Sequence, residues 1–289
     1  MAGIDYDKGT LKSVEVLNGE QSRTEWAIYS NYTMTFGNLS VTPGVRYDNT
    51  STSGDFWSPS LGVTYLIDKN TLLRALITRG FSSPPLGYIF ASTEFFVPNE
   101  NLRMEETWSY QTGVETKALK YFLFKGTLFR HDVDNAIEPQ EFPNGTFTYV
   151  NVDKVRRQGV EVEIKTDEIY NTALMAGATY DDVKDLLTGQ SVAGTAKYSF
   201  DFGIRYAKGD TTLALRGHYI AWNIGNIFTP QQYKTVLDFN ANKTLLKRQD
   251  IKVDIFAAIH NIFNVQQYLD ITQMNAGRWL EGGMRISFF

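Results

Sequence analysis

The feature that most constrains this chain is a one-by-one alternation of apolar and polar residues. It recurs from residue 26 to the last residue in segments of about ten residues, as in residues 26–36, 198–206 and 251–259. Because successive side chains of a strand point to opposite faces, each segment predicts a strand with one apolar and one polar face. No segment longer than about a dozen residues shows a helical period. The sequence therefore predicts an all-β protein.

The polar side of these segments decides between two all-β architectures. No apolar run approaches the ~18 to 20 residues that a membrane helix needs, so hydropathy alone leaves a soluble β-sandwich open. Strands of about ten residues fit a tilted membrane crossing better than the usual soluble strand of about five or six. In an antiparallel transmembrane β-barrel, the charged side would face a polar lumen. The residues expected there are Glu115, Lys117, Glu161, Glu163, Lys165, Asp201, Arg205, Asp238, Lys252, Asp254 and Arg285.

The connections between the segments also favour the barrel. Short turns near residues 37, 69, 120, 168, 208 and 247 alternate with mostly longer connections. Outer-membrane barrels have short turns on the periplasmic side and long loops outside, whereas a sandwich has no reason to sort its loops. The longer connections are predicted at residues 50–55, 82–107, 132–157, 181–196, 223–232 and 265–276.

The number of strands bears on whether the barrel is complete. The alternation gives about thirteen strands, whereas single-chain bacterial barrels usually have an even number. If the last residue ends on the periplasmic side, residues 8–23 become an outside loop and residues 3–7 the stump of one more strand. The opening residues lack the basic start and apolar core of a signal peptide, so we expect that they are not the natural start. A partial barrel of 13 to 14 strands and a complete small barrel both remain open.

Four stretches of the sequence then resemble one family, the TonB-dependent outer-membrane receptors. They are RGFSSPPL at residues 79–86, NENLRME at 99–105 followed by SYQTGVE at 109–115, YVNVDKVRRQGVEVE at 149–163, and a terminal box. The second stretch departs from the family signature where Glu100 and Met104 replace prolines. The terminal box comprises NIFN at 261–264, Tyr268, Gly277, Arg278 and the final Phe289.

The resemblance implies a fold and a function. In that family a plug domain precedes a 22-stranded barrel, so residues 1–289 would correspond to one partial barrel of about the last fourteen strands, with no plug domain. The features near residues 133–137 and 180–185 are similar to the siderophore and cobalamin branch. The implied function is import of a ferric siderophore or cobalamin-like chelate across the bacterial outer membrane. The implied partners are outer-membrane lipid, the barrel assembly machinery, and the TonB complex through the missing plug alone.

Two sets of residues follow as candidates for these roles. The terminal strand resembles the signal read by the assembly machinery, carried by Trp279, Met284, Ile286, Phe288 and Phe289. Aromatic residues in or beside the long loops would suit a ligand mouth, because they give contact area at low entropic cost, although they could equally pack the loops. The mouth candidates are Phe90, Phe95, Phe96, Phe142, Phe147, Tyr149, Trp222 and Phe228.

Metal and catalytic sites have less support in the sequence. The three histidines lie far apart, and no cofactor is indicated. Asp181, Asp182 and Asp185 on an expected outside loop could supply only part of a calcium site, since calcium takes six to eight oxygens; a solvated loop is the default. His131 and Asp132 could mimic the Asp/His pair of a barrel hydrolase, but we expect no enzyme. A net charge of −4 argues against a nucleic-acid partner. The main alternative to the receptor is a plugless, porin-like passive channel.

Overall fold

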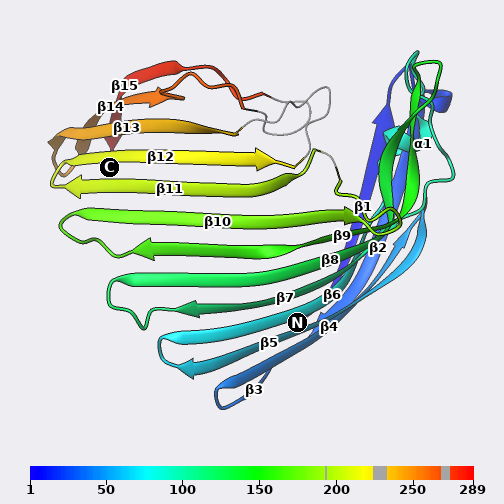
Figure 1. Cartoon of the computed structure of the whole chain (residues 1–289), viewed down its shortest axis with the longest axis horizontal. Coiled ribbons are helices and arrows are strands. Elements are labelled where there is room, and N and C mark those ends of the chain that lie inside the picture. Colours follow the sequence, from blue (N-terminus) through cyan, green and yellow to red (C-terminus); the bar gives the residue numbers. More distant parts are fainter. Residues whose placement is uncertain (193, 224–232, 268–273) are drawn as a thin grey trace.

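The computed structural model describes residues 1–192, 194–223, 233–267 and 274–289. Its strands form one antiparallel sheet, in which fourteen strands follow each other in chain order and a short fifteenth, β3, pairs with β4 (Figure 1). The helical elements in this described part are the 3-10 turn η1 (Leu17–Gly19) and the five-residue helix α1 (Leu86–Phe90). No helix among the described residues is long and apolar enough to cross a membrane. The prediction of an antiparallel all-β fold with 13 to 14 strands is confirmed.

The strands alternate between short and long connections. The short connections follow β3, β5, β7, β9, β11 and β13, while most connections at the other end, including residues 83–104, are longer. The bounds are β1 (Ala2–Lys12), β2 (Glu20–Asn31), β3 (Met34–Phe36), β4 (Leu39–Thr50), β5 (Gly54–Asp68), β6 (Thr71–Ser82), β7 (Glu105–Thr116), β8 (Phe122–Glu141), β9 (Phe147–Thr166), β10 (Thr172–Asp185), β11 (Ala196–Lys208), β12 (Thr211–Trp222), β13 (Tyr233–Lys247), β14 (Ile251–His260) and β15 (Trp279–Phe288).

The strand register keeps the apolar residues on one face of the whole sheet. Leu61 of β5 pairs with Ile77 of β6, and Ile77 pairs with Tyr110 of β7. Further along, Ile204 of β11 pairs with Leu215 of β12. These side chains form a continuous belt, and a slip of one residue in any strand would place its apolar set on the opposite face.

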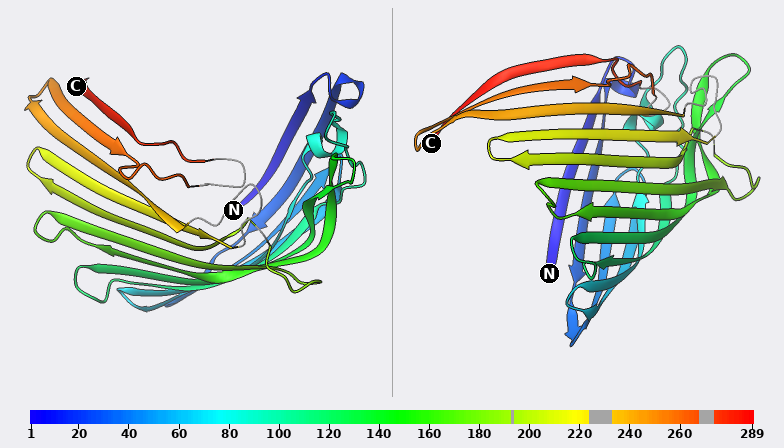
Figure 2. Two further views of the ribbon diagram at one scale, coloured as in Figure 1. Left: turned by 45° about the horizontal axis from the view of Figure 1, so that its top comes forward. Right: turned by 60° about the vertical axis from the view of Figure 1, so that its left-hand side comes forward.

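The polar residues lie on the concave face. Figure 2 shows that the sheet curves into a trough. Side chains converge on the concave side of a curved sheet, so contacts across an intervening strand identify that side. Arg46 of β4 pairs with Asp5 of β1 across β2, at 2.5 Å. Arg74 of β6 donates to Thr127 of β8 across Gly113, at 3.1 Å. The apolar belt is therefore the convex face and the polar face lines the lumen.

Two hairpins are longer than the sequence predicts. Residues 3–7 were expected as a stump and 8–23 as a loop, but β1 and β2 pair along eleven residues and leave only residues 13–19 as the connection. Likewise, most of the predicted loop at 132–157 belongs to β8 and β9, which are joined by residues 142–146. Both extensions pass beyond the apolar belt, where both faces of a strand can be polar. The alternation therefore fades although the backbone pairing continues.

The two ends of the sheet are β1 and β15, which are not paired with each other in the described part of the chain. Of the predicted assembly-signal residues, Met284, Ile286 and Phe288 lie on the apolar face of β15, and Phe289 follows with 79% of its surface exposed. Trp279 differs from this set, because it stacks on the lumen-facing His260 with ring centroids 3.8 Å apart. Trp279 therefore lies on the lumen face, opposite to the three apolar-face residues of the predicted assembly signal.

Candidate ligand mouth and lumen wall

The loop at residues 83–104, which includes α1, is fastened to its neighbours at both ends. On one side, Ala91 forms a β-bridge with Val16 in the β1–β2 connection. On the other, Phe96 forms a parallel bridge with Phe147 at the start of β9. The amide of Val97 donates to the carbonyl of Phe147 at 2.9 Å. The loop therefore adds a short extra strand to the tip of the β8–β9 hairpin, on the long-loop side of the sheet (Figure 1).

An aromatic cluster lies where this loop meets the hairpin. Tyr88 of α1 stacks on Tyr149 of β9, with centroids 3.7 Å apart and planes 9° apart. Phe96 and Phe147 pack against the pair, with Phe96 5.8 Å from Tyr149 and 5.2 Å from Phe147. Burial, and then the hydrogen bond with Tyr88, raise the pKa of Tyr149 to about 12. The Tyr149 phenol therefore stays protonated at neutral pH, and its ring presents a neutral aromatic surface.

Two asparagines, from separate sequence motifs, connect the loop at residues 83–104 to strand β9. Asn99 donates its side-chain amide to the carbonyl of Tyr149 at 2.9 Å. Asn151 accepts from the amide of Arg103 at 2.8 Å and donates to the carbonyl of Arg103 at 3.0 Å. The side-chain amide of Asn151 also donates to the carbonyl of Asn135 in β8 at 2.7 Å. Because side-chain amides satisfy backbone groups that would otherwise lack partners, these residues fasten the loop to the β8–β9 hairpin. Both motifs were identified in the sequence, but only the structure shows that they contact each other.

Below the mouth, the concave face carries charged and polar side chains. Arg157 of β9 pairs with Asp181 of β10 at 2.6 Å, and its guanidinium lies 5.7 Å from the ring centre of Phe129. His131 of β8 shares a hydrogen bond of 2.8 Å with Ser109 of β7. A Cβ atom at Gly159 would lie 1.9 Å from the carbonyl oxygen of Tyr180, so the close approach here requires glycine. This wall offers both donors and acceptors to a polar solute.

A hollow in the lumen wall continues this polar surface toward the short turns. Its volume is about 440 Å³, and charged residues of both signs line it. Arg74, Lys125, Glu161, Glu163 and Asp201 contribute these charges from β6, β8, β9 and β11. The hollow is open and mixed in charge, so it suits passage of a polar solute rather than tight retention.

The predicted mouth residues separate into two groups. Phe96, Phe147 and Tyr149 meet in the aromatic cluster, where they pack the loop onto the hairpin and also shape its surface. The others stand apart: Phe95 and Phe142 are 63% and 39% exposed, Phe90 is half-buried in α1, Trp222 is buried at the end of β12, and Phe228 lies outside the described residues. Sequence reasoning missed Tyr88. The two prolines before α1 were part of a quoted motif, but its pattern did not indicate an aromatic contact.

The three candidate calcium ligands do not converge. Asp181, Asp182 and Asp185 belong to strand β10 rather than to a loop, and neighbours along a strand face opposite ways. Asp181 pairs with Arg157, Asp182 pairs with Lys184 at 3.0 Å, and Asp185 accepts from the amides of Leu187 and Thr188. No group of three or more potential metal ligands occurs within the described ranges. These three side chains therefore do not lie together as ligands of one ion would.

The possible hydrolase pair is also separated. His131 faces the lumen, whereas Asp132 faces outward and accepts from Arg130 and Arg156. Because the two residues are adjacent on one strand, their side chains cannot form a hydrogen-bonded pair on one face. The His131–Asp132 dyad of the hydrolase alternative does not form.

Comparison with known proteins agrees with this architecture. The family described as TonB dependent receptor-like, beta-barrel matches residues 2–262. The chain belongs to this family. It therefore shares the fold class expected from its four sequence stretches, an antiparallel barrel wall.

The relatives include receptors and a transporter. The ferric enterobactin receptor of Pseudomonas aeruginosa is 31% identical over 114 residues, which cover 34% of this chain and 15% of that protein. The vitamin B12 transporter of Vibrio vulnificus is 29% identical over 142 residues, covering 47% and 22%. The solved siderophore receptor PirA of Pseudomonas aeruginosa superposes on 100% of this chain and 51% of its own, with a TM-score of 0.78 and 20% identity. The chain thus spans about half the length of this solved receptor.

Proposed function

We propose that this chain forms the wall and part of the ligand mouth of an outer-membrane importer for a metal chelate. The observation that carries the proposal is the placement of the aromatic cluster, Tyr88, Phe96, Phe147 and Tyr149, at the long-loop end of a polar lumen wall. A passive channel needs the polar wall but has no need of an aromatic cluster that packs a loop onto a hairpin at the rim. The names of the relatives, a ferric enterobactin receptor and a vitamin B12 transporter, support a chelate as the cargo.

The two parts of the site would act in sequence. Flat aromatic faces at the mouth would contact the organic shell of a chelate, since such surfaces give contact area with little loss of side-chain freedom. The mixed charges below, including Arg157 and Asp181, would then replace water around a polar cargo during passage. Energy coupling to the TonB complex would involve a plug domain and not the residues of this chain. Chemistry on the cargo is not part of the proposal.

The test uses the full-length protein in cells, with ferric enterobactin and cyanocobalamin as probes. The informative variant is Tyr149→Ala, and the matched control is Tyr170→Ala on the short-turn side, where Tyr170 is 92% exposed. We expect at least one probe to bind, Tyr149→Ala to weaken that binding at least about tenfold, and Tyr170→Ala to leave it unchanged. Failure of both probes, together with a steady ion conductance in planar bilayers, would favour the porin-like channel instead.

A further inference from the structure

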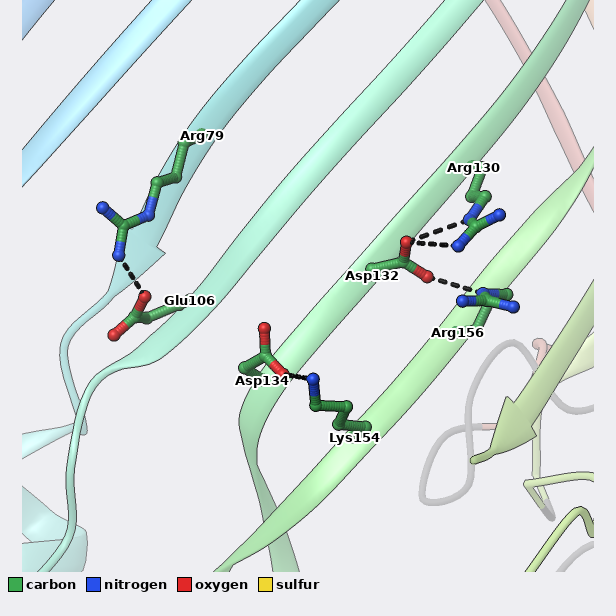
Figure 3. A network of polar contacts seen from close by, with 7 residues as sticks. All are labelled: Arg79, Glu106, Arg130, Asp132, Asp134, Lys154 and Arg156. Atoms are coloured by element: carbon green, nitrogen blue, oxygen red, sulfur yellow. Dashed lines mark hydrogen bonds and ion pairs between the residues drawn. The ribbon is translucent and has the colours of Figure 1, made fainter. Parts of the chain in front are cut away.

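A row of charged residues lies on the convex face, just beyond the apolar belt and toward the long loops. In β6 to β9, register pairs continue upward from Ile77 and Tyr110: Trp108 pairs with Arg79 and Asp132, and Glu106 pairs with Asp134. The row therefore shares its face with the belt and not with the lumen. Figure 3 shows its members in β6 to β9, which are Arg79, Glu106, Arg130, Asp132, Asp134, Lys154 and Arg156.

The centre of this row has two arginines on one carboxylate. Arg130 contacts one oxygen of Asp132 through two nitrogens, at 2.9 and 2.8 Å. Arg156 contacts the other oxygen of Asp132 through Nε alone, at 2.6 Å. Both guanidinium groups remain partly exposed, with 44% and 31% of their side-chain surface accessible. Among the described residues, the terminal nitrogens of Arg156 have no other acceptor, so they keep donors available for a further one.

Cations exceed carboxylates along the row. Lys184 of β10 pairs in register with Arg156 and extends the row by one strand. Each exposed ion pair of this kind contributes little to stability, typically about 0 to 1 kcal/mol. Stability therefore does not explain the arrangement. The five cations Arg79, Arg130, Lys154, Arg156 and Lys184 face the four carboxylates Glu106, Asp132, Asp134 and Asp182, which leaves one positive charge in excess.

An apolar hollow lies directly below Arg130 on the same face. Its volume is about 400 Å³, and Arg130 forms part of its lining. The floor is formed where Ala75 of β6 pairs with Thr112 of β7, two small side chains. Larger side chains form the walls; they are Leu61, Ile77, Tyr110 and Leu128. An apolar hollow in the lipid-facing belt has the shape and chemistry to hold a hydrocarbon chain.

We propose that the hollow and the charged row together bind one phosphorylated, acylated lipid of the outer leaflet. An acyl chain lies in the hollow over Ala75 and Thr112. The phosphate lies against Arg130 and Arg156, since guanidinium groups hold phosphate with paired hydrogen bonds. The two halves of the site are joined through Arg130, which touches both. This lipid site is independent of the chelate mouth. The charged row lies on the convex face of the sheet, whereas the mouth cluster lies where the loop at residues 83–104 meets the β8–β9 hairpin.

The test measures lipid retention by the full-length protein. The protein is purified in detergent and titrated with diphosphoryl lipid A, and bound lipid is counted by native mass spectrometry. The double variant Arg130→Gln/Arg156→Gln removes the phosphate contacts. The matched control is Arg205→Gln/Arg216→Gln, which changes two arginines on the lumen face of β11 and β12. Migration of the unheated protein on gels verifies that each variant forms a barrel.

We expect the Arg130/Arg156 variant to bind the lipid at least tenfold more weakly and the lumen control to bind like the wild type. Thr112→Leu, which fills the floor of the hollow, should also weaken binding. Phosphatase-treated lipid should bind the wild type as weakly as intact lipid binds the double variant. Equal binding of intact lipid by wild type and double variant would overturn the proposal. So would equal binding of intact and phosphatase-treated lipid by the wild type.

Discussion

The apolar belt and the long-loop rim of this molecule are built by different rules. In the belt, backbone ladders join the strands, and a side chain needs only the right polarity for its face, as where Ile204 pairs with Leu215. At the rim, particular side chains bind particular backbone groups, as where Asn151 holds both backbone groups of Arg103. The belt therefore tolerates exchange among apolar residues, while the rim depends on residue identity. Changes to the belt should affect the whole barrel, and changes to the rim should act locally.

The largest effect is expected from a charge on the lipid-facing side of the belt. Leu215→Arg places a cation among Ile204 and Phe239, and such a change near the bilayer centre costs about 2–4 kcal/mol. The matched control is Ala214→Arg, one residue away on the lumen face. Urea titration of the full-length protein in lipid vesicles gives the free energy of unfolding. Equal destabilisation by the two variants would contradict the assignment of the faces.

A smaller effect is expected where two strands approach closely. Gly159→Ala introduces a Cβ atom 1.9 Å from the carbonyl oxygen of Tyr180, so β9 and β10 must shift apart. Overpacking of this kind costs about 1–3 kcal/mol. Gly177→Ala is the control, because its nearest neighbour would be 3.8 Å away. In the same urea titration, Gly159→Ala should unfold at a lower urea concentration than Gly177→Ala. An unchanged unfolding midpoint for Gly159→Ala would show that β9 and β10 accommodate the extra methyl group without loss of stability.

A rim change should loosen one loop and leave the barrel intact. Asn151→Ala removes the partner of both backbone groups of Arg103, at a local cost of about 1–3 kcal/mol. Asn151 also donates to the carbonyl of Asn135 in β8 at 2.7 Å, so a local effect there is expected too. Hydrogen exchange at residues 99–104 should speed up, while exchange in strands away from the β8–β9 hairpin stays unchanged. Asn101→Ala serves as the control, since within the described chain only the backbone amide of Asn101 takes part in a hydrogen bond. Faster hydrogen exchange throughout the barrel would contradict the claim that changes at the rim act only locally.

The smallest effect concerns pH at the tip of the β8–β9 hairpin. Burial, together with the nearby Glu105 and Asp185, raises the pKa of Glu138 above its usual value. A carboxyl with a raised folded-state pKa contributes stability that is present below its ordinary pKa and disappears as pH rises through the raised value. As pH rises from the ordinary pKa of a glutamate through the raised pKa of Glu138, local opening at the hairpin tip should therefore increase, as measured by hydrogen exchange. Glu138→Gln should flatten the dependence; an identical dependence in the variant would assign it to another group.

The sequence predicted the belt well because the belt has a period. Alternation alone indicated the strands, their apolar face and the charged lumen face that includes Glu161 and Asp201. It failed at β1 and at the tips of β8 and β9, because strands that extend into water carry polar residues on both faces. The rim contacts could not be predicted either. Asn99 and Asn151 lie 52 positions apart, and no local pattern indicates that one loop carries both contacts.

The separation of lipid and lumen faces is the central claim, and spin labels along β11 test it most directly. Residues 1–289 contain no cysteine, so single cysteines introduced from position 199 to 202 and at 204 and 205 can be labelled with no background from this part of the protein. The full-length protein in lipid vesicles is then exposed to oxygen, which concentrates in lipid, and to a water-soluble nickel complex. We predict that labels at 200, 202 and 204 respond to oxygen and those at 199, 201 and 205 to nickel. Equal responses at neighbouring positions, or the reverse alternation, would contradict the account.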